Sequence, residues 1–471
     1  MKRRLMALAI STMLLLSACG ASGSTAPSGT APASAAPNQS TQPEYIGNTL
    51  QYDVNAPVNN GEKLDLLVWA EPETEGYYSS IAEKYMEIHP NISIQVVSQP
   101  WDDYWTKLPL ALSAGNGPDL YRSHYGHIKE LAIYSHSLPE DIFPREDLFA
   151  DFPDAEDLIM EDGGLYSIPL GSTFSSGIYY NKAMWAEAGL TEADIPKTWD
   201  DFIRVGQALT KKDAKGNVTQ YGFSIDHAFQ VFLVNMNYMS GQALVKEDQF
   251  TWNLDAPKTY ENIELLRKFK DEYGFMMYGD GDCEDQFGHG QAAMMSNWNW
   301  VGGYFDETYP ELDWGYFLCP TQDGQPAPAY GLKDYEWSLG VSSADEQKRA
   351  VAFDFLKYFL CEQTVYCDLA IRLGLMPSNV QLASDPRVAE YENLRVAAEV
   401  ADRHVYLGAI PGNAARNTAL RAAGSDIFIN KKDPQEVIPA TQANIMENMR
   451  LNQMNYTAKE NQYKYYSELA Q

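Results

Sequence analysis

Short apolar runs separated by polar stretches predict alternating strands and helices at the start of the globular body. Residues 64–69 (LDLLVW) form an apolar run of strand length, and residues 91–97 alternate apolar and polar positions. Between them, a polar loop over residues 71–76 precedes apolar positions at helical spacing, which predict a helix through about Ile88. This order predicts a βαβ unit of an open sheet. Ligands bind such sheets beyond the carboxyl ends of the strands, so we expect Trp69 and the following loop at the mouth of a site.

In the middle of the chain, two short strands are followed by two capped helices. Residues 165–170 and 178–180 are predicted strands, and the small polar segment GSTFSSG separates them. Asn181 is predicted to cap the helix that follows, because asparagine is favoured at the N-cap. Thr198 with Asp201 three residues later is close to a capping box and predicts the start of the second helix.

The length of the body exceeds what a single hydrophobic core usually supports. About 410 residues follow residue 61, so two lobes are expected. Further helices and strands are predicted in both halves. Helices are expected over residues 101–114, 227–239 and 345–360 and over much of residues 385–449, and strands over residues 222–225 and 337–341.

The N-terminal end has the pattern of a secretion signal. Basic residues precede an apolar run over residues 5–16, which is too short for a permanent membrane span. The segment LSACG that follows resembles a bacterial lipobox, which implies a signal peptide over residues 1–18 and lipidation of Cys19; an ordinary signal with a chance cysteine is the alternative. Residues 19–61 are predicted to be a disordered tether, or alternatively a glycosylated stalk, with order beginning near Glu62.

Charge and composition narrow the classes of partner. The chain has 64 acidic and 35 basic residues, for a net charge of −29, so nucleic acid and anionic membranes would repel it. The same charge disfavours phosphate or sulfate as a ligand and leaves sugars, cations and peptides open. Aromatic residues make up 12% of the chain, with 10 Trp and 30 Tyr, which is enough to furnish both cores and binding surfaces.

Several motifs occur in the order typical of one protein family. They are GNGPDL at residues 115–120, the GGLYSIPLG…YNK…AGL…PKTW stretch within residues 163–202, FGHGQAAM at residues 287–294, GLMP at residues 374–377 and DPQEVIPA at residues 433–440. This series resembles the sugar-binding branch of the extracellular solute-binding proteins of ABC importers, which includes the maltose-binding proteins. The resemblance covers nearly the whole chain after about residue 62.

The resemblance implies an α/β fold with two lobes, the type II periplasmic-binding-protein-like fold, in which each lobe is an open mixed sheet flanked by helices. The implied N-terminal lobe comprises residues 62–172 and 328–377, and the C-terminal lobe comprises residues 173–327 and 378–471, with a hinge between the lobes. It also implies a monomer that delivers its ligand to the transmembrane subunits of an ABC permease, and a carrier rather than an enzyme, with no cofactor.

Carbohydrates need aromatic rings for their C–H faces and planar polar groups for their hydroxyls. The family motifs and the predicted strand ends bring such residues to the expected mouth. The candidate ligand-binding residues are Trp69, Glu71, Glu73, Trp101, Tyr121, His124, Phe174, His227, Phe229, Trp298, Trp300, Tyr330, Trp337 and Arg416.

Two of these tryptophans receive a more specific expectation. Trp298 and Trp300 are expected on a strand, where at most one of them is expected to face the same side as the ligand. The family pattern favours Trp300, because the family usually has glycine at the position of Trp298. The unusual Trp298 is the alternative, as an additional platform for the ligand.

Other ligand chemistries have weaker support in the sequence. The acidic loop at Glu71, Glu73 and Glu75 can in principle bind a cation or a polyamine, and His124 with His127 has a spacing that chelates a metal on a helix. A peptide ligand and a secreted glycoside hydrolase, which would need two opposed carboxylates, remain as alternatives. No catalytic signature is visible.

The cysteines do not identify a metal site or a disulfide pattern. Besides Cys19, the chain has Cys283, Cys319, Cys361 and Cys367, without CxxC or zinc-like spacing. Disulfides are permitted outside the cell, but the sequence does not define a pairing.

Overall fold

The computed structural model describes residues 43–124, 127–160, 162–226, 228–244, 251–279, 281–406 and 413–451. The predicted signal peptide, Cys19 and the first part of the predicted tether lie outside the described residues, as does His227. Within the described ranges, the structure has no helix of the length and hydropathy that a membrane span requires.

The first sheet has seven strands in the order β15-β6-β14-β5-β3-β4, with β16 paired to β14. β3 is parallel to β4 and β5, whereas β14 is antiparallel to β5 and β6. The strands are β3 (Leu64–Ala70), β4 (Ile92–Ser98), β5 (Leu120–His124), β6 (Pro169–Phe174), β14 (Gly331–Val341), β15 (Met376–Pro377) and β16 (His404–Val405).

The predicted βαβ unit is confirmed, because helix α1 (Pro72–Ile88) connects the parallel strands β3 and β4. The polar loop predicted after Trp69 is wrong, however. Pro72 occupies the first turn of α1, where its missing N–H and fixed φ favour helix formation. Only Glu71 stays outside the helix, at its N-cap.

The predicted strand over residues 165–170 is displaced in the structure. Strand β6 covers Pro169–Phe174, so the small polar residues expected to separate two strands belong to the strand itself. Its register is set by β14, where Lys333 pairs with Phe174 and Tyr335 pairs with Ser172. A partner strand far along the sequence therefore decided the position of β6.

The prediction of a disordered tether up to residue 61 is also wrong for its last part. Strands β1 (Tyr45–Gly47) and β2 (Gln51–Asp53) form an antiparallel pair. Leu50 and Tyr52 are buried in the first core, and the Tyr52 hydroxyl donates to Asp354 Oδ1 at 2.7 Å. These contacts stabilise the segment although its composition resembles a linker.

The second sheet has five strands in the order β11-β10-β12-β7-β13 and its own aromatic core. Its strands are β7 (Gly177–Asn181), β10 (Phe223–Ser224), β11 (Met276–Met277), β12 (Met294–Asn297) and β13 (Trp314–Leu318). Between β7 and β10 in the chain, β8 (Lys211–Lys212) and β9 (Val218–Gln220) form a separate antiparallel pair.

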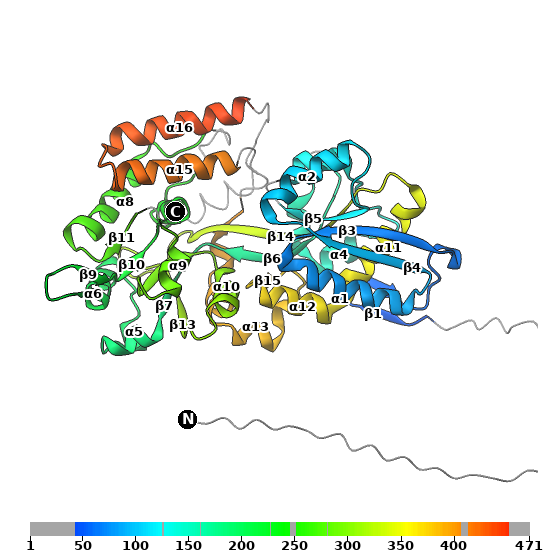
Figure 1. The fold of residues 1–471 in the computed structure, drawn as a ribbon, viewed down its shortest axis with the longest axis horizontal. Helices are drawn as coiled ribbons and strands as arrows, with labels where there is room; N and C mark the ends of the chain where they lie inside the picture. The colour runs from blue at the N-terminus through cyan, green and yellow to red at the C-terminus, as the bar shows by residue number, and fades with distance from the viewer. Residues whose placement is uncertain are drawn as a thin grey trace, which may run out of the picture. The chain divides into compact units, whose positions relative to one another are not determined.

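Helices surround both sheets, and the predicted ones are present with small shifts at their ends. In Figure 1, α15 and α16 run side by side and pack against each other. Besides α1, the helices are α2 (Trp101–Ser113), α3 (Ile128–Leu131), α4 (Arg145–Asp151), α5 (Lys182–Glu187), α6 (Trp199–Leu209), α7 (Phe229–Met239), α8 (Pro257–Arg267), α9 (Cys283–Gly288), α10 (Val301–Thr308), α11 (Glu346–Cys361), α12 (Gln363–Arg372), α13 (Pro386–Glu390), α14 (Glu392–Ala398), α15 (Asn413–Phe428) and α16 (Pro434–Leu451).

The caps predicted in the middle of the chain are confirmed. Asn181 Oδ1 accepts from the Met184 N–H at 3.0 Å at the start of α5. Thr198 and Asp201 form a reciprocal capping box at the start of α6.

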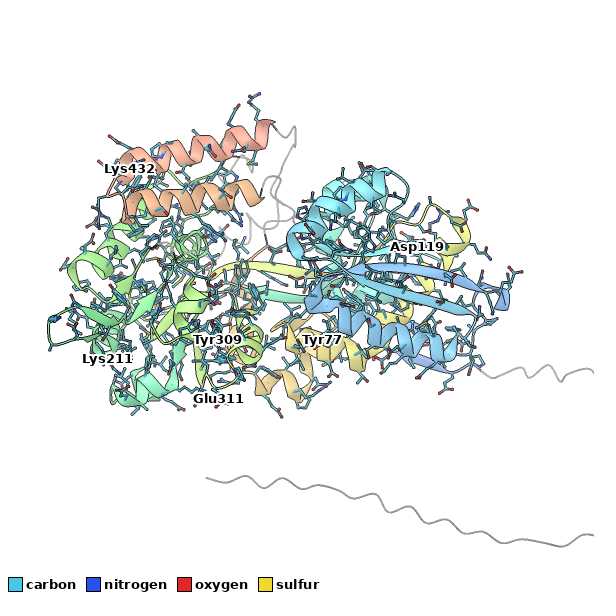
Figure 2. The ribbon with its side chains drawn as sticks, in the orientation of Figure 1. Tyr77, Asp119, Lys211, Tyr309, Glu311 and Lys432 are labelled. Carbon is cyan, nitrogen blue, oxygen red and sulfur yellow. The ribbon has the colours of Figure 1, made fainter. Side chains whose placement is uncertain are left out.

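The aspartate of the GNGPDL motif binds three separate segments together. Asp119, labelled in Figure 2, accepts from the Leu67 N–H at 2.9 Å and from Ser343 Oγ at 2.7 Å. Its carboxylate also pairs with Lys348 Nζ at 2.9 Å. These contacts place β5 beside β3, so that the residues after Asp119 run toward the cavity described next.

Candidate ligand-binding site

A cavity of about 480 Å³ is lined by residues from both sheets and their helices. This volume lies within the roughly 300–1,000 Å³ range of small-ligand sites. Its walls are formed by Glu71, Thr74, Arg122, His124, Thr173, Ala228, Gln230, Val231, Val234, Glu284, Asn297, Trp298, Trp300, Leu332, Asp334, Glu336, Leu373, Leu375, Arg416, Asn417, Leu420 and Arg421.

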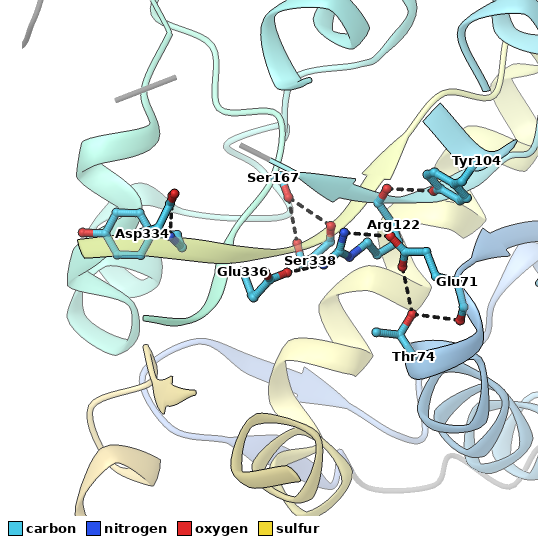
Figure 3. A network of polar contacts seen from close by, with 9 residues as sticks. Glu71, Thr74, Tyr104, Arg122, Ser167, Asp334, Glu336 and Ser338 are labelled. Atoms are coloured by element: carbon cyan, nitrogen blue, oxygen red, sulfur yellow. Dashed lines mark hydrogen bonds and ion pairs between the residues drawn. The ribbon is translucent and has the colours of Figure 1, made fainter. Parts of the chain in front are cut away.

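A buried arginine between two carboxylates forms one wall of the cavity (Figure 3). Arg122 on β5 donates from Nη1 to Glu71 Oε1 at 2.7 Å and from Nη2 to Glu336 on β14. Thr74 Oγ1 donates to the other oxygen of Glu71 at 3.2 Å. A buried guanidinium is tolerated only when it is paired and hydrogen-bonded in this way. The arrangement therefore holds polar groups rigidly at the wall.

Burial and pairing act in opposite directions on this cluster. Burial raises the pKa of Glu71, and the nearby Arg122 opposes that shift. Burial lowers the pKa of Arg122, but the charges of Glu336 and Glu71 outweigh it and leave the pKa above its usual value. Arg122 is thus a permanent cation in the wall.

His124 lies two residues after Arg122 on the same strand and also lines the cavity. Burial lowers its pKa well below the usual value, and the positive charge of Arg122 adds to that effect. The imidazole is therefore neutral at physiological pH and can both donate and accept a hydrogen bond.

The metal-chelating geometry considered for His124 and His127 is wrong. His124 ends strand β5 and His127 lies in the turn before α3, so the two do not share a helix face. The His127 ring instead stacks on Trp105, with ring centroids 4.2 Å apart. No group of three or more metal-binding side chains occurs among the described residues.

Trp298 and Trp300, both candidate ligand-binding residues, line the cavity, and the strand alternation predicted for them is wrong. Strand β12 ends at Asn297, before either tryptophan. Trp300 has helical backbone angles, φ −61° and ψ −23°, and is the N-cap of α10. The side-chain alternation of a strand therefore does not extend to them. Trp300 is 41% exposed, which leaves the residue available for contact.

Glu284 on α9 adds a buried carboxyl to the lining of the cavity. Its Oε1 accepts from Asn297 Nδ2 at 2.6 Å, and Asn297 Oδ1 accepts from the Trp298 N–H at 2.8 Å. Burial, followed by the neighbouring Asp282, raises the pKa of Glu284 to about 8. At neutral pH this carboxyl can both donate and accept, while the Asn297 bridge positions Trp298.

Helix α7 contributes an apolar wall with one polar group. Val231 and Val234 line the cavity together with Gln230. The Gln230 Oε1 atom is buried and has no hydrogen-bond partner among the described residues. A buried acceptor without a partner is costly, so a ligand hydroxyl donating to it would stabilise the site.

Helix α15 completes the wall with Arg416, as the resemblance implied, and with Asn417, Leu420 and Arg421. Arg416 donates from Nε and Nη2 to Asn417 Oδ1 at 3.1 and 2.9 Å. Its guanidinium also lies 5.4 Å from the Trp252 ring centroid. Arg416 is therefore held by neighbours at the cavity edge.

Other candidates from the sequence pack away from the cavity. Tyr121 and Phe229 are fully buried, the first bonded to Ser135 Oγ at 2.6 Å and the second packed against Phe428. Trp69 packs beside Tyr104, Phe174 packs against His404, and Tyr330 packs against Ala327 and Val400. None of these five residues lines the cavity, and all except the half-buried Trp69 lie in the protein interior. The side chains of Glu73, Trp101, His227 and Trp337 lie outside the described residues.

Several wall residues were absent from the sequence-based set. Arg122 had a signal, since it follows the GNGPDL motif, after which the resemblance places residues that face the cleft, and since a charged residue inside a buried strand needs a partner. Glu336, Asp334 and Gln230 had no such signal, because the direction of their side chains depends on strand pairing and helix packing.

The four cysteines Cys283, Cys319, Cys361 and Cys367 are free and buried, so no disulfide involves them.

The amino-acid sequence is similar to those of known solute-binding proteins. The family model described as bacterial extracellular solute-binding protein matches residues 70–363. The maltotriose-binding protein of Pyrococcus abyssi is 25% identical over 334 residues, covering 69% of this chain and 68% of the relative. The maltodextrin-binding protein MdxE of Bacillus subtilis is 30% identical over 325 residues, covering 66% and 72%. The diacetylchitobiose-binding protein DasA of Streptomyces coelicolor is 24% identical over 344 residues, covering 69% and 75%.

Solved structures share the fold. The maltose/maltodextrin-binding domain of Bdellovibrio bacteriovorus, solved with maltotriose, has a TM-score of 0.67 at 19% identity and covers 82% of this chain and 100% of that domain. A substrate-binding protein of Listeria monocytogenes, solved with cycloalternan, has a TM-score of 0.67 at 18% identity and covers 83% and 100%. The predicted two-lobed type II fold is confirmed by this likeness.

Proposed function

The chain belongs to the family of bacterial extracellular solute-binding proteins, and on that premise we propose that it captures a sugar or oligosaccharide between two lobes. It then delivers the sugar to the transmembrane subunits of an ABC permease. The sugars named for the relatives of the chain support this ligand class.

The observation that carries the proposal is the composition of the cavity wall. Trp298 and Trp300 supply aromatic faces for the C–H side of a sugar ring. Glu284, Gln230 and the neutral His124 supply groups that donate to or accept from hydroxyls. Because these groups come from elements of both sheets, one ligand can contact both lobes at once.

Lobe closure around the ligand is part of the proposal. We assign residues 62–172 and 328–377 to one lobe, and residues 173–327 with helices α15 and α16 to the other, because α15 and α16 pack in the second core. Leu382, Val388 and Leu394, from the segment between residue 377 and α15, pack in the first core. The chain passes between the sheets directly after β6 and returns along β14, whose residues Asp334 and Glu336 line the cavity. Short crossing segments of this kind act as hinges in two-lobed binding proteins.

The N-terminal sequence supports a proposal on where the protein is held. We propose that residues 1–18 are removed and that a lipid on Cys19 holds the protein at the outer face of the cell membrane as a monomer. The role is that of a carrier, without a catalytic step. A polyamine is less suited to this cavity than a sugar, because Glu71 and Glu336 already pair with Arg122.

Thermal unfolding of the purified protein against a ligand panel tests the proposal. The panel contains maltotriose, longer maltodextrins, mannotriose and diacetylchitobiose, with spermidine and a short peptide as non-sugar controls. A ligand at a hundredfold excess over its Kd stabilises the folded state by about 2.7 kcal/mol. We expect a concentration-dependent rise in Tm with one sugar class. A rise with spermidine or the peptide alone would overturn the proposal of a sugar ligand.

A further inference from the structure

A fully buried asparagine separates the two tryptophans of the cavity. The side chains of Trp298 and Trp300 line the cavity, whereas Asn299 between them is 0% exposed. A buried amide must have its hydrogen bonds satisfied within the protein. The partners of Asn299 therefore show what this tryptophan-bearing turn is attached to.

The first attachment is to strand β6, where the chain leaves the first sheet. Asn299 Oδ1 accepts from Thr173 Oγ1 and from the Phe174 N–H, each at 2.7 Å. The Asn299 N–H donates to the Phe174 carbonyl at 2.9 Å. Thr173 itself lines the cavity, so the same contact sets the position of two parts of the wall.

The second attachment is to the turn after α12. Asn299 Nδ2 donates to the Gly374 carbonyl at 3.1 Å. Gly374 has φ +62°, and a Cβ added there would lie 2.8 Å from Trp300 Cα. Its neighbours Leu373 and Leu375 line the cavity. Backbone packing at this point is therefore as close as glycine permits.

The third attachment is to the second sheet and its helices. The Asn299 carbonyl accepts from Tyr179 Oη at 2.7 Å and from Asn393 Nδ2 at 2.6 Å. Tyr179 lies on β7, the strand that the chain enters after crossing from β6. One residue thus connects the end of β6, the turn at Gly374 and the strand β7.

We propose that Asn299 is a positioning residue for ligand binding, which holds Trp298 and Trp300 in the cavity wall and ties them to the segments that cross between the two sheets. Movement of these segments then shifts the two tryptophans, and a ligand that contacts the tryptophans favours one arrangement of the segments. The inference rests on the proposed function for the identity of the ligand. The bonds that carry it join residues of the protein alone.

The test uses fluorine NMR of the protein labelled with 5-fluorotryptophan, in the absence of ligand. The resonances of Trp298 and Trp300 are assigned with the variants Trp298→Phe and Trp300→Phe. We expect Asn299→Ala to shift or broaden these two resonances selectively, while those of tryptophans in the second core, such as Trp185 and Trp199, stay in place. Resonances of Trp298 and Trp300 that match the wild type would overturn the proposal.

Asn237 provides a matched control. It is also buried, at 1% exposure, and its side chain donates to Thr259 Oγ1 at 3.1 Å and accepts from Asn262 Nδ2 at 2.9 Å. It does not line the cavity, so Asn237→Ala removes comparable bonds without touching the crossing segments. If both variants moved the two resonances equally, the role of Asn299 would be that of any buried asparagine, and the proposal would fail.

A second pair of variants decides the question if Asn299→Ala does not fold. Thr173→Val keeps the shape of the side chain but lacks the hydroxyl that donates to Asn299, whereas Thr173→Ser keeps the hydroxyl. We expect Thr173→Val to move the Trp298 and Trp300 resonances and Thr173→Ser to leave them near the wild-type positions. Equal spectra for the two variants would overturn the proposal.

Titration with maltotriose adds a functional readout. We expect Asn299→Ala to weaken the Kd for maltotriose about tenfold or more, and Asn237→Ala to change it by less than about twofold. Absence of maltotriose binding to the wild type would count against this sugar as the ligand, and the fluorine spectra would still decide the role of Asn299. An unchanged Kd in Asn299→Ala would overturn the positioning role.

Discussion

Arg122 Nη1 lies 2.7 Å from Glu71 Oε1, and both side chains are almost fully buried at the wall of the cavity. Glu336 accepts from the other terminal nitrogen of Arg122, so the one guanidinium forms ion pairs with two carboxylates. Removing one partner from a buried ion pair leaves the other charge uncompensated in a medium of low polarity. This relationship makes the wall both rigid and sensitive to substitution.

Arg122→Met is therefore expected to lower the free energy of unfolding by about 3–5 kcal/mol, measured by urea denaturation. The matched control is Lys107→Met, which breaks the exposed pair of Lys107 with Asp103 at 2.8 Å and is expected to cost less than about 1 kcal/mol. Similar losses in both variants would show that the buried cluster does not contribute specifically to stability.

Glu284 should make stability fall as the pH rises. Its pKa is raised from 4.5 to about 8 in the folded protein, so between these values the folded state holds a proton that the unfolded state has released. Across that pH window, Glu284 then lowers the free energy of unfolding by up to about 1.4 kcal/mol for each pH unit. Urea denaturation at a series of pH values measures this slope.

The variant Glu284→Gln is the control for that slope, because glutamine does not titrate and keeps a group that can accept from Asn297 Nδ2. We expect the difference in stability between variant and wild type to grow in favour of the variant as the pH approaches about 8. A constant difference across the window would contradict a raised pKa at this carboxyl.

Trp300→Ala separates ligand binding from stability. Trp300 is 41% exposed and lines the cavity, so the loss of its ring is expected to weaken sugar binding with little effect on the free energy of unfolding. A loss of about 1.4 kcal/mol of binding free energy corresponds to a tenfold weaker Kd, which calorimetric titration resolves.

Trp185→Ala is the converse variant. Trp185 is 4% exposed within the second core and does not line the cavity. We expect it to destabilise the fold by about 3–5 kcal/mol, the usual cost of truncating a buried aromatic residue. For Trp300→Ala, a Kd for the sugar equal to that of the wild type would show that Trp300 is not part of the binding surface.

Gly374→Ala tests the close approach of Gly374 to the backbone of Trp300. An alanine there would adopt an unfavourable positive φ, at about 1–2 kcal/mol, and would also place Cβ 2.8 Å from Trp300 Cα. Gly189→Ala is the control, since Gly189 has φ +73° but nothing lies within 4 Å of an added Cβ. Urea denaturation is expected to show a clearly larger loss for Gly374→Ala. Equal losses would mean that backbone strain alone accounts for the effect.

Local features of the fold were predictable because neighbouring residues decide them. The caps at Asn181 and Thr198 depend on side chains that bond within three residues, and both were recognised from the sequence. The order of motifs likewise identified the family, since each motif is a short contiguous string. The extent of β6 was not predictable in the same way, because β14 sets its register from a distant part of the chain.

The sequence by itself determined the fold class, the family and a set of residues rich enough in aromatic and polar groups to bind a sugar. Only the tertiary structure decided which of them line the cavity. Arg122 and Glu336 are 214 positions apart and meet because β5 and β14 are adjacent strands. Tyr121, by contrast, faces the interior although it directly precedes Arg122 on the same strand. Side-chain direction depends on which neighbour covers each face of a strand or helix, and those neighbours come from segments far apart in the sequence.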